Sequence, residues 1–496
     1  MTERASFLVA PSDVAGLRST IAKIAGFGYS ENAVRDRLGV EDLTELQWHS
    51  APVRRAERLS NRDPLALAID LFLLQGALPA EELDQLLSGS QQDVLSRAGL
   101  LAIDETGVAR ARASLFPVGN RLIFSDHAWP ELPHPGYAVV PPDLVMRIGP
   151  DSRHLARCTV RRPFRAALDL CTGSGVHALL ASPHAGRVLA VDINPRAALC
   201  TRFNAQISGA ANLDVVIGDL FEGVRDERFD LITANPPFVP SPLDALLFRD
   251  GGRSGEDVQK RIVSGLPRHL APGGMAQIVT ELGERDHEPL VARVREWLNG
   301  APLDIHLLRL NEHTAMKYAV GHAQGDDFRT RLDSIDEWAG NLRSQGYVRI
   351  VSVVITFQWS DVRCGSPWER VDESQPPHRP AGTEIEAIFR AERGARQLDT
   401  AELRSSVLCR TGPIALLDAK VLGSDLRAKT KATLMGQALT MEHQIDAIER
   451  EILERLEGPI PVSELIGMFP VIKMDEPTVI AAVRSLLRRR LVRIDS

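Results

Sequence analysis

The motif Asn235-Pro-Pro-Phe238 is made of residue types that can hold a planar nitrogen in one position. The side-chain oxygen of Asn235 and the backbone carbonyl of Pro236 can accept both hydrogens of an NH2 group, and the two prolines restrict φ and keep these acceptors rigid. An amide or aromatic amine nitrogen is a weak nucleophile, so catalysis must supply its orientation toward a methyl donor, and Phe238 can cover it as it gains positive charge. The motif therefore predicts methyl transfer without a strong general base. Asn235, Pro236 and Phe238 are the predicted catalytic residues, and Pro237 joins them in contact with the acceptor.

Three further motifs precede this one, and their residues are of types that can bind a nucleotide. Asp169-Leu-Cys-Thr-Gly-Ser-Gly175 is a turn of small residues, which lets the backbone approach a ligand. Asp192 can accept hydrogen bonds from both hydroxyls of a ribose, and Asp219 can accept one from an adenine amino group. The glycine turn also satisfies the Gly-x-Gly-x-x-Gly/Ala pattern of dinucleotide-binding enzymes, so this motif alone leaves a nicotinamide enzyme open. No motif in the sequence supplies the proton relay that such an enzyme needs.

These motifs must be positioned by strands that end at one edge of a sheet. Seven apolar segments alternate with helical stretches, at 166–170, 187–191, 214–217, 231–234, 275–280, 304–310 and 349–358. The alternation predicts an α/β fold with a seven-stranded, mostly parallel, doubly wound Rossmann-like sheet. Each of the four motifs follows one of the first four strands, at the edge where such sheets bind cofactors.

In this order, the four motifs make residues 165–360 resemble the class I S-adenosylmethionine-dependent methyltransferases. The stretches 235–242, 249–256 and 270–274 are most similar to release-factor glutamine N5-methyltransferases and to relatives that act on guanine or adenine amino groups of ribosomal RNA. The resemblance implies S-adenosyl-L-methionine as cofactor and either a protein side-chain amide or a nucleobase amino group as acceptor. Phe238 stands where the glutamine enzymes more often have Tyr, and in this respect also resembles the guanine-N2 enzymes. The implied cofactor-binding residues are Asp169, Thr172, Gly173, Gly175, Asp192, Ile193, Asp219 and Leu220.

The segments on either side of this domain read as helical. Residues 1–115 order their helices and strands as in a winged helix, and residues 401–496 repeat that order. The repeat is short, and two unrelated helical hairpins would fit the same pattern. We expect a β connector at 116–164, the methyltransferase domain at 165–362 and a linker at 363–400, which is rich in Pro, Arg and Glu. We interpret the arginines between Arg484 and Arg493 as a solvated face rather than a phosphate-binding surface, because no aromatic residues interleave with them.

Two other functions fit the same domain order. A small-molecule methyltransferase could use the outer domains to enclose its pocket. A winged-helix nucleic-acid-binding regulator could use the central domain as a cofactor sensor, although a sensor has no need of an acceptor-orienting motif at Asn235. We expect a protein or RNA substrate rather than a small molecule.

The composition of the chain limits which partners, locations and metal sites we expect. The net charge of −7 does not indicate nucleic-acid binding by the whole chain. The first residues lack the apolar core of a signal peptide, and the most apolar run, at 65–74, contains Asp70 and is too short for a bilayer, so we expect a cytoplasmic protein without a membrane segment. The five cysteines form no C-x-x-C pair and no metal-ligand spacing, which predicts reduced thiols and no structural metal.

Overall fold

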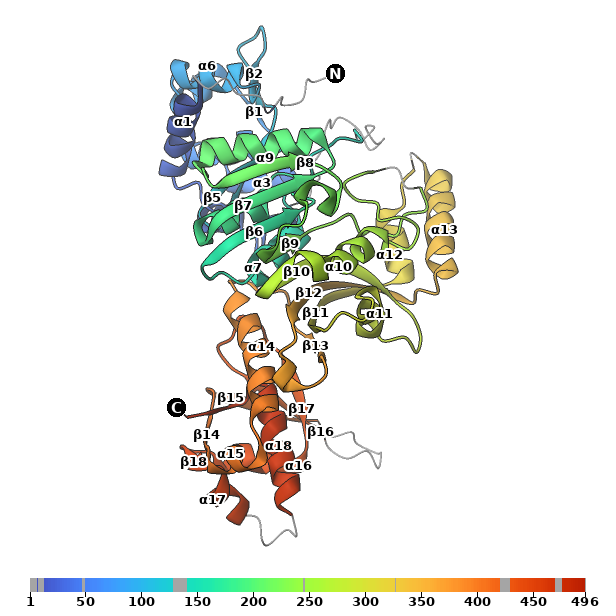
Figure 1. Cartoon of the computed structure of the whole chain (residues 1–496). Helices are drawn as coiled ribbons and strands as arrows, with labels where there is room; N and C mark the ends of the chain where they lie inside the picture. The colour runs from blue at the N-terminus through green and yellow to red at the C-terminus, as the bar shows by residue number, and fades with distance from the viewer. Residues whose placement is uncertain are drawn as a thin grey trace. The chain divides into compact units, whose positions relative to one another are not determined.

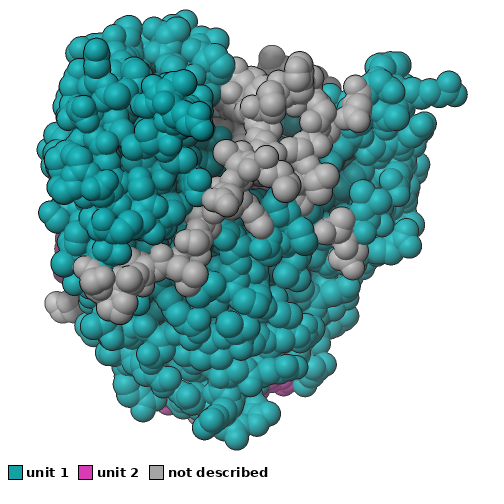
Figure 2. Space-filling model, turned by 90° about the horizontal axis from the view of Figure 1, so that it is seen from above, with its two compact units in different colours: residues 1–156, 162–299, 312–352 teal, residues 157–161, 300–311, 353–496 magenta. Residues whose placement is uncertain are grey.

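The computed structural model consists of two compact units (Figure 1; unit 1 is teal in Figure 2). Unit 1 comprises residues 1–156, 162–299 and 312–352, and unit 2 comprises residues 157–161, 300–311 and 353–496. Within them, the structure describes residues 7, 13–46, 50–127, 141–243, 246–325, 327–419, 429–468 and 475–495.

Five parallel strands form the centre of unit 1. They are β6 (Phe164–Leu170), β7 (Ala185–Asp192), β8 (Leu213–Ile217), β9 (Phe229–Ala234) and β10 (Leu270–Glu284), in the spatial order β10-β9-β6-β7-β8. The order in which strands are added changes side at β6: β7 and β8 lie on one side of it, and β9 and β10 lie on the other. Such a switch point leaves a crevice beyond the carboxyl ends of the strands, where the four motifs lie.

The main sheet has eight strands and not the seven expected. Its complete order is β13-β11-β12-β10-β9-β6-β7-β8, with β11 (Leu303–Thr314), β12 (Arg349–Trp359) and β13 (Glu369–Glu373). The additional strand, β13, pairs in parallel with β11, from Ile305 opposite Glu369 onward. Its sequence, Glu-Arg-Val-Asp-Glu, is polar because it forms the edge of the sheet, so it lacks the apolar pattern by which the other seven segments could be predicted.

Helices connect the strands of the parallel sheet, and α9, α10 and α11 are labelled in Figure 1. The helix α8 (Val176–Ala181) joins β6 to β7, α9 (Pro195–Ser208) joins β7 to β8, and α10 (Asp257–His269) lies between β9 and β10. After β10 comes α11 (Leu290–Trp297). The doubly wound α/β arrangement agrees with the expected fold class, and it brings the N-termini of α8 and α9 to the edge that carries the motifs.

The described residues of the N-terminal part of unit 1 include six α-helices. These are α1 (Val14–Gly26), α2 (Glu31–Leu38), α3 (Ala51–Arg58), α4 (Pro64–Phe72), α5 (Ala80–Leu86) and α6 (Gly89–Arg97), and they accompany a small antiparallel sheet of β1 (Ala77–Leu78), β3 (Ala109–Ala111) and β2 (Leu101–Ile103). The order from α4 to β3 is the one expected of a winged helix, and that assignment stays a prediction. The hairpin β4 (Ser114–Val118) and β5 (Arg121–Ser125) follows, and α7 (Pro150–Cys158) precedes β6. Residues 128–140 of the expected β connector lie outside the described residues.

Two helices between β11 and β12 pack on the segment that follows β9. They are α12 (Ala315–His322) and α13 (Phe328–Ser344), and Tyr318 and Trp338 are their largest residues in a buried cluster with Val239. Phe238 packs against this cluster. The two helices therefore support one side of the Asn235-Pro-Pro-Phe238 motif.

Unit 2 has its own hydrophobic core. Its helices are α14 (Gly382–Gln397), α15 (Thr400–Ser405), α16 (Ala447–Arg455), α17 (Val462–Gly467) and α18 (Glu476–Arg488). Two three-stranded sheets complete it, β18-β14-β19 and β15-β16-β17, from β14 (Val407–Arg410), β15 (Ile414–Ala419), β16 (Lys429–Leu434), β17 (Glu442–Ile445), β18 (Ile460–Pro461) and β19 (Val492–Ile494). Residues 363–400, expected as a linker, contain β13 and α14.

The basic C-terminal segment is not simply the solvated face that we expected. The Arg488 guanidinium donates to Glu392 at 2.7 Å, and that of Arg489 donates to Glu449 at 2.8 Å, while both carboxylates are buried. Arg484 donates to the backbone carbonyl of Ala395 at 2.6 Å. These arginines hold α18 to its neighbours within unit 2.

Three properties concern the whole described part of the chain. None of its helices is long and apolar enough to cross a membrane. Its residues include no group of His, Cys, Asp and Glu that could hold a metal ion. The five cysteines are free, and Cys158, Cys200 and Cys409 are buried.

Candidate active site

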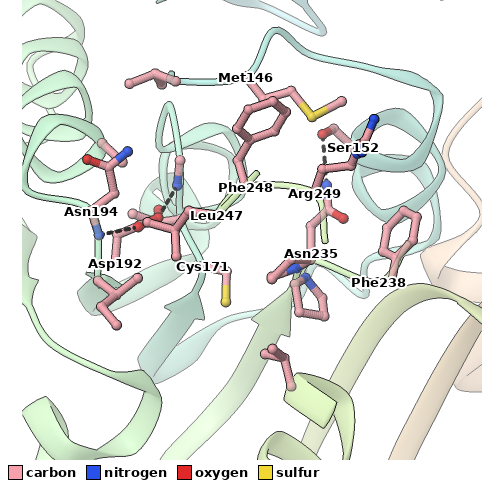
Figure 3. A pocket seen from close by; sticks show the side chains of 18 of the residues that line it. Met146, Ser152, Cys171, Asp192, Asn194, Asn235, Phe238, Leu247, Phe248 and Arg249 are labelled. Carbon is pink, nitrogen blue, oxygen red and sulfur yellow. Dashed lines mark hydrogen bonds between the residues drawn. The ribbon is translucent and has the colours of Figure 1, made fainter. Parts of the chain in front are cut away.

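A cavity of about 420 Å³ lies at the carboxyl ends of the parallel strands in unit 1 (Figure 3). Most of the residues that the sequence singled out line it: Thr172, Gly173, Asp192, Ile193, Asp219, Leu220, Asn235, Pro236, Pro237 and Phe238. Asp169 and Gly175 are not among the lining residues. The four motifs thus surround one cavity. Asp169 and Gly175 support its wall without lining it.

The glycine turn after β6 has two glycines with different tasks. Gly173 has φ +58°, and a Cβ built on it would meet no atom within 4 Å, because the space above its backbone is open. Gly175 has φ +82° and begins α8, and a Cβ there would lie 2.8 Å from Cγ2 of Thr201 on α9. Gly173 therefore exposes backbone to the cavity, whereas Gly175 lets α8 and α9 approach each other.

Asp169 supports the glycine turn through hydrogen bonds on the side away from the cavity. Its buried carboxylate accepts hydrogen bonds from the hydroxyls of Thr172 at 2.6 Å and Thr233 at 2.7 Å, and from the backbone N–H of Ala178 at 3.2 Å. Burial raises the pKa of Asp169 to about 6, although these bonds oppose the shift. The carboxylate thus ties the ends of β6 and β9 to the start of α8.

The second and third motifs place two carboxylates on the cavity wall. Asp192 accepts the backbone N–H of Gly173 at 2.8 Å and that of Asn194 at 2.9 Å, and burial raises its pKa (Figure 3). Asp219 accepts a hydrogen bond from the Arg261 guanidinium at 2.8 Å. A carboxylate has about four acceptor positions, so both residues keep capacity for hydroxyl or amino groups of a ligand.

Cys171 also faces the cavity, next to the glycine turn (Figure 3). Burial raises the pKa of its thiol well above the usual value, and the negative charges of Asp192 and Asp169 raise it further. The thiol is therefore protonated at neutral pH and is a poor nucleophile. We assign it no chemistry.

The fourth motif is oriented by a residue that sequence reasoning missed. The side-chain nitrogen of Asn235 donates to Oγ of Ser152 at 3.0 Å (Figure 3). Ser152 lies on α7, is buried, and lines the same cavity. Because the amide nitrogen is taken by Ser152, the Asn235 oxygen is the part of this side chain left to accept a hydrogen bond from a ligand.

The segment after the motif forms a tight loop against it. Val239 exchanges backbone hydrogen bonds with Arg249 and Gly251, at 2.9 and 3.0 Å. A Cβ on Gly255 would lie 2.4 Å from the backbone oxygen of Phe238, so only glycine fits there. In this loop Arg249 lines the cavity and Asp250 is buried.

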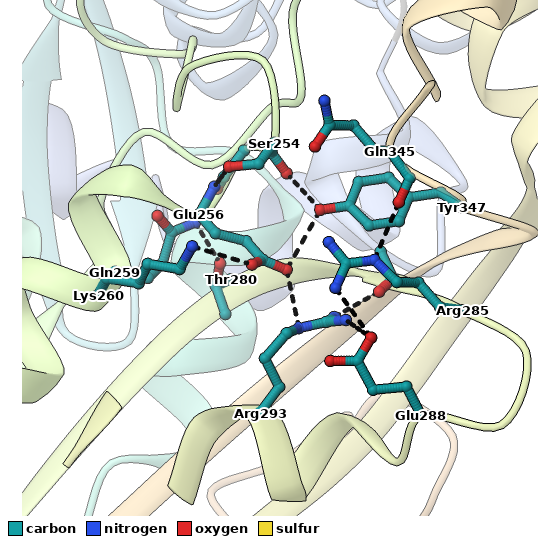
Figure 4. Close-up of polar contacts among 12 residues, drawn as sticks. Ser254, Glu256, Gln259, Lys260, Thr280, Arg285, Glu288, Arg293, Gln345 and Tyr347 are labelled. Atoms are coloured by element: carbon teal, nitrogen blue, oxygen red, sulfur yellow. Dashed lines mark hydrogen bonds and ion pairs between the residues drawn. The ribbon is translucent and has the colours of Figure 1, made fainter. Parts of the chain in front are cut away.

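A buried polar network anchors this loop (Figure 4). Glu256, 1% exposed, forms an ion pair with Arg293 at 3.1 Å and accepts a hydrogen bond from the Tyr347 hydroxyl at 3.3 Å. The same hydroxyl lies 2.9 Å from the carbonyl of Ser254. The network links α10, α11 and the segment before β12 to the loop that contacts Phe238.

Two acidic residues in the cavity were also missed, Asp151 on α7 and Glu281 in β10. Burial raises the pKa of Asp151 to about 6, and burial together with the charge of Asp151 raises that of Glu281 to about 8. The Tyr318 hydroxyl donates to Oε2 of Glu281 at 2.6 Å. A glutamate inside the apolar run of β10 was a visible signal, whereas nothing in the sequence marks Asp151. The other missed lining residues include Met146, Leu247, Phe248 and His322.

The central region matches known methyltransferases. Residues 146–296 match the family model of the methyltransferase small domain, and residues 26–112 match a domain of unknown function (DUF7059). The chain is 34% identical over 166 residues to the release factor glutamine methyltransferase of Geobacter sulfurreducens, which is 30% of this chain and 57% of that protein. It is 39% identical over 132 residues to the ribosomal protein uL3 glutamine methyltransferase of Bradyrhizobium diazoefficiens, 23% of this chain and 40% of that protein.

A solved structure gives a weaker match. The ribosomal protein L11 methylase of Lactobacillus delbrueckii subsp. bulgaricus is 17% identical, covers 43% of this chain and 77% of its own, and has a TM-score of 0.26. The chain spans about half the length of the curated relatives named above. The resemblance of the central region to class I methyltransferases, and to the glutamine enzymes among them, is confirmed.

Proposed function

We propose that this protein transfers a methyl group from S-adenosylmethionine to a side-chain amide nitrogen of a protein substrate. The observation that carries the proposal is the position of Asn235 to Phe238 on the wall of a cavity that also contains Gly173 and Asp192. The relatives that share this region are named as methyltransferases of glutamine in a release factor and a ribosomal protein. This favours a protein amide over a nucleobase amino group.

The chemistry of the cavity fits S-adenosylmethionine. The open space over Gly173 is a cradle that a side chain would fill, and Asp192 and Asp219 offer acceptors for ribose hydroxyls and an adenine amino group. Ile193 is 49% exposed and, with Leu220, gives the cavity an apolar wall against which a base can lie. The volume is within the range of about 300–1,000 Å³ that is typical of ligand pockets. When bound, the sulfonium group supplies an electrophilic methyl.

The residues of the fourth motif orient the acceptor. Ser152 holds the nitrogen of the Asn235 amide, so that the amide oxygen and the carbonyl of Pro236 can accept the two N–H groups of the acceptor. Fixing the nitrogen in this way supplies the positioning that a weak nucleophile requires. Phe238, held by the cluster around Trp338, covers the nitrogen while positive charge develops.

The remaining parts of the proposal concern the rest of the chain. We propose that the winged-helix-like segments 1–115 and 401–496 select the substrate, with 116–164 and 363–400 joining them to the methyltransferase domain at 165–362. We also propose a cytoplasmic location, because release factors and ribosomal proteins act there.

The proposal is tested by transfer of labelled methyl from S-adenosylmethionine into cell lysate that is then separated into protein, RNA, DNA and small-molecule fractions. We expect label in the protein fraction with the parent protein and a strong loss of it with Asn235→Ala, while cofactor binding by calorimetry is unchanged. Label confined to RNA would move the acceptor to a nucleobase, and label in small molecules would favour a biosynthetic enzyme. Cofactor binding without label in any fraction contradicts the proposed reaction.

A further inference from the structure

The acceptor side of the cavity contains a pair of carboxyl groups that the motif does not explain. Glu281 lies in β10, where Ile278 is paired with Ala234 of β9, so Glu281 and Asn235 both follow this pair toward the same edge of the sheet. Asp151 is the neighbour of Ser152 on α7, the residue that holds Asn235. Both acids line the cavity together with Asn235 and Phe238.

Tyr318 fixes the position of Glu281. The tyrosine is 3% exposed, its ring stacks on that of His322 with centroids 4.1 Å apart, and its hydroxyl donates to Oε2 of Glu281 at 2.6 Å. Tyr318 belongs to the buried cluster that also supports Phe238, so Glu281 and the acceptor motif share one rigid support. The other oxygen of Glu281 forms no hydrogen bond with any residue that the structure describes, and it is available to a ligand.

The two carboxyl groups cannot both ionise easily. Burial and the charge of Asp151 raise the pKa of Glu281 to about 8, and burial raises that of Asp151 to about 6. Nearby titratable or charged groups include Tyr318, His322 and the guanidinium of Arg249. Arg147 and His177 also line the cavity. At neutral pH the pair therefore carries about one proton and one negative charge.

We propose that Glu281 and Asp151 together accept the proton that the acceptor nitrogen must lose when it is methylated. This inference rests on the proposed function. The nitrogen lone pair forms a bond to the methyl carbon, and the carbon–sulfur bond breaks with its electron pair remaining on sulfur. One N–H bond then breaks, its electrons stay on nitrogen, and the proton bonds to a carboxylate oxygen of the pair, which becomes neutral.

A weak base is sufficient for this step. A protonated N-methyl amide is a far stronger acid than a carboxylic acid, so transfer to the pair is downhill. The enclosed position of the pair gives the proton an acceptor inside the cavity, and Tyr318 keeps the carboxylate of Glu281 in one orientation. The pair thus completes the acceptor site without the strong general base that the motif does not need.

The decisive variant is the double substitution Asp151→Asn with Glu281→Gln. Single-turnover methyl transfer is measured between pH 5 and 9, on the protein acceptor identified by the labelling experiment. In the parent, we expect the rate to fall as the pH drops through the lower pKa of the pair, because a doubly protonated pair has no place for a further proton. In the double variant, we expect a rate at least tenfold lower that no longer shows this fall, with the KM for the acceptor changed less than threefold. Glu284→Gln, in the same strand but outside the cavity lining, is the matched control and retains the parent profile.

A second measurement does not depend on activity. Carboxyl carbon NMR is used to titrate Glu281 in the parent and in two variants that retain it. Asp151→Asn removes a neighbouring negative charge and lowers the pKa of Glu281, whereas Tyr318→Phe removes a stabilising hydrogen bond and raises it. Shifts in these opposite directions support the coupled pair, and an unchanged Glu281 titration in both variants overturns it.

The outcomes separate this inference from the proposed function. A parent protein that binds S-adenosylmethionine but transfers no methyl group overturns both. A parent that transfers methyl and a folded double variant that matches its rate and pH profile overturn only the role of the pair. Should the double variant fail to fold in a thermal melt, the pH profile of Asp151→Asn decides. If the pair accepts the proton, the acid-side fall of this variant coincides with the Glu281 titration that NMR measures in the same variant; if not, the fall stays where it is in the parent.

Discussion

The amide nitrogen of Asn235 donates to the hydroxyl of Ser152 across 3.0 Å, although the two residues are 83 positions apart in the sequence. An asparagine amide can rotate by half a turn and exchange its donor and acceptor. In the structure the hydroxyl of Ser152, a buried serine on α7, accepts from the amide nitrogen, and in this orientation the amide oxygen is left for the substrate. Substrate orientation by the fourth motif therefore depends on a residue outside it.

Replacing Ser152 with Ala is expected to lower kcat/KM for the acceptor about tenfold, a loss of the size of one hydrogen bond of about 1–1.5 kcal/mol. Affinity for S-adenosylmethionine, measured by calorimetry, should change less than twofold, because Ser152 contacts the acceptor motif. Ser152→Thr retains the hydroxyl and serves as the control. Equal kcat/KM for Ser152→Ala and the parent would show that Asn235 needs no such support.

The two glycines of the first motif are expected to respond differently to alanine. Gly173→Ala should weaken cofactor binding at least tenfold at a cost of about 1 kcal/mol in unfolding free energy, because its Cβ enters the open space of the cavity. Gly175→Ala should cost about 2 kcal/mol or more, because its Cβ meets Thr201 at 2.8 Å in addition to the unfavourable positive φ. Calorimetric binding and urea unfolding of both variants test the assignment. The opposite pattern, tight binding by Gly173→Ala, would place the cofactor elsewhere.

The buried ion pair behind the acceptor loop should matter for stability. Glu256→Gln leaves the buried guanidinium of Arg293 without its 3.1 Å partner and is expected to cost about 3 kcal/mol in unfolding free energy. Glu288→Gln removes the other carboxylate near Arg293, at 3.3 Å, but this group is 35% exposed and its loss should cost less than about 1 kcal/mol. Thermal and urea unfolding measure both. Similar costs for the two variants would mean that Glu256 is not the anchor.

Cys171 is expected to alkylate slowly despite its place in the cavity. Its pKa is raised by burial and by neighbouring carboxylates, so the reactive thiolate is scarce at pH 8 and increases as the pH rises above 9. Iodoacetamide labelling, followed by mass spectrometry of the Cys171 peptide, should give a rate well below that of a free cysteine peptide at pH 8. A fast reaction at pH 8 would indicate a thiolate and would return a chemical role to this residue.

Local sequence patterns were sufficient to predict seven of the eight strands of the main sheet. Six of the seven apolar segments form strands that are largely buried in the sheet, whereas β8, an edge strand, is partly exposed and was predicted from its β-branched residues. The residues at the ends of the parallel strands meet at one edge because these strands share their direction. β13 was missed because an edge strand needs no apolar pattern. The prediction that the two flanking segments, 1–115 and 401–496, are winged helices rests only on the order of their helices and strands.

In the cavity, too, some residues could be predicted from local sequence and others could not. Gly173, Asp192 and Asn235 lie at or within three residues of the ends of β6, β7 and β9, so their positions could be predicted from the motifs. Ser152 and Asp151 enter from α7, and Tyr318 comes from a helix inserted after β11, so only tertiary packing brings them to the motif. Asp169 was assigned to the cofactor from its motif, and the structure places it behind the turn, bonded to Thr172 and Thr233.

The central claim is that the acceptor is a side-chain amide oriented by Asn235, and it is tested most directly by locating the transferred methyl group. Protein labelled by the parent enzyme is digested, and the labelled peptide is fragmented in a mass spectrometer to find the modified residue and atom. We predict one added methyl on the side-chain nitrogen of glutamine or asparagine, and none when Asn235→Ala replaces the parent. A methyl group on a carboxylate, on lysine or on RNA, or undiminished labelling by Asn235→Ala, would contradict the account.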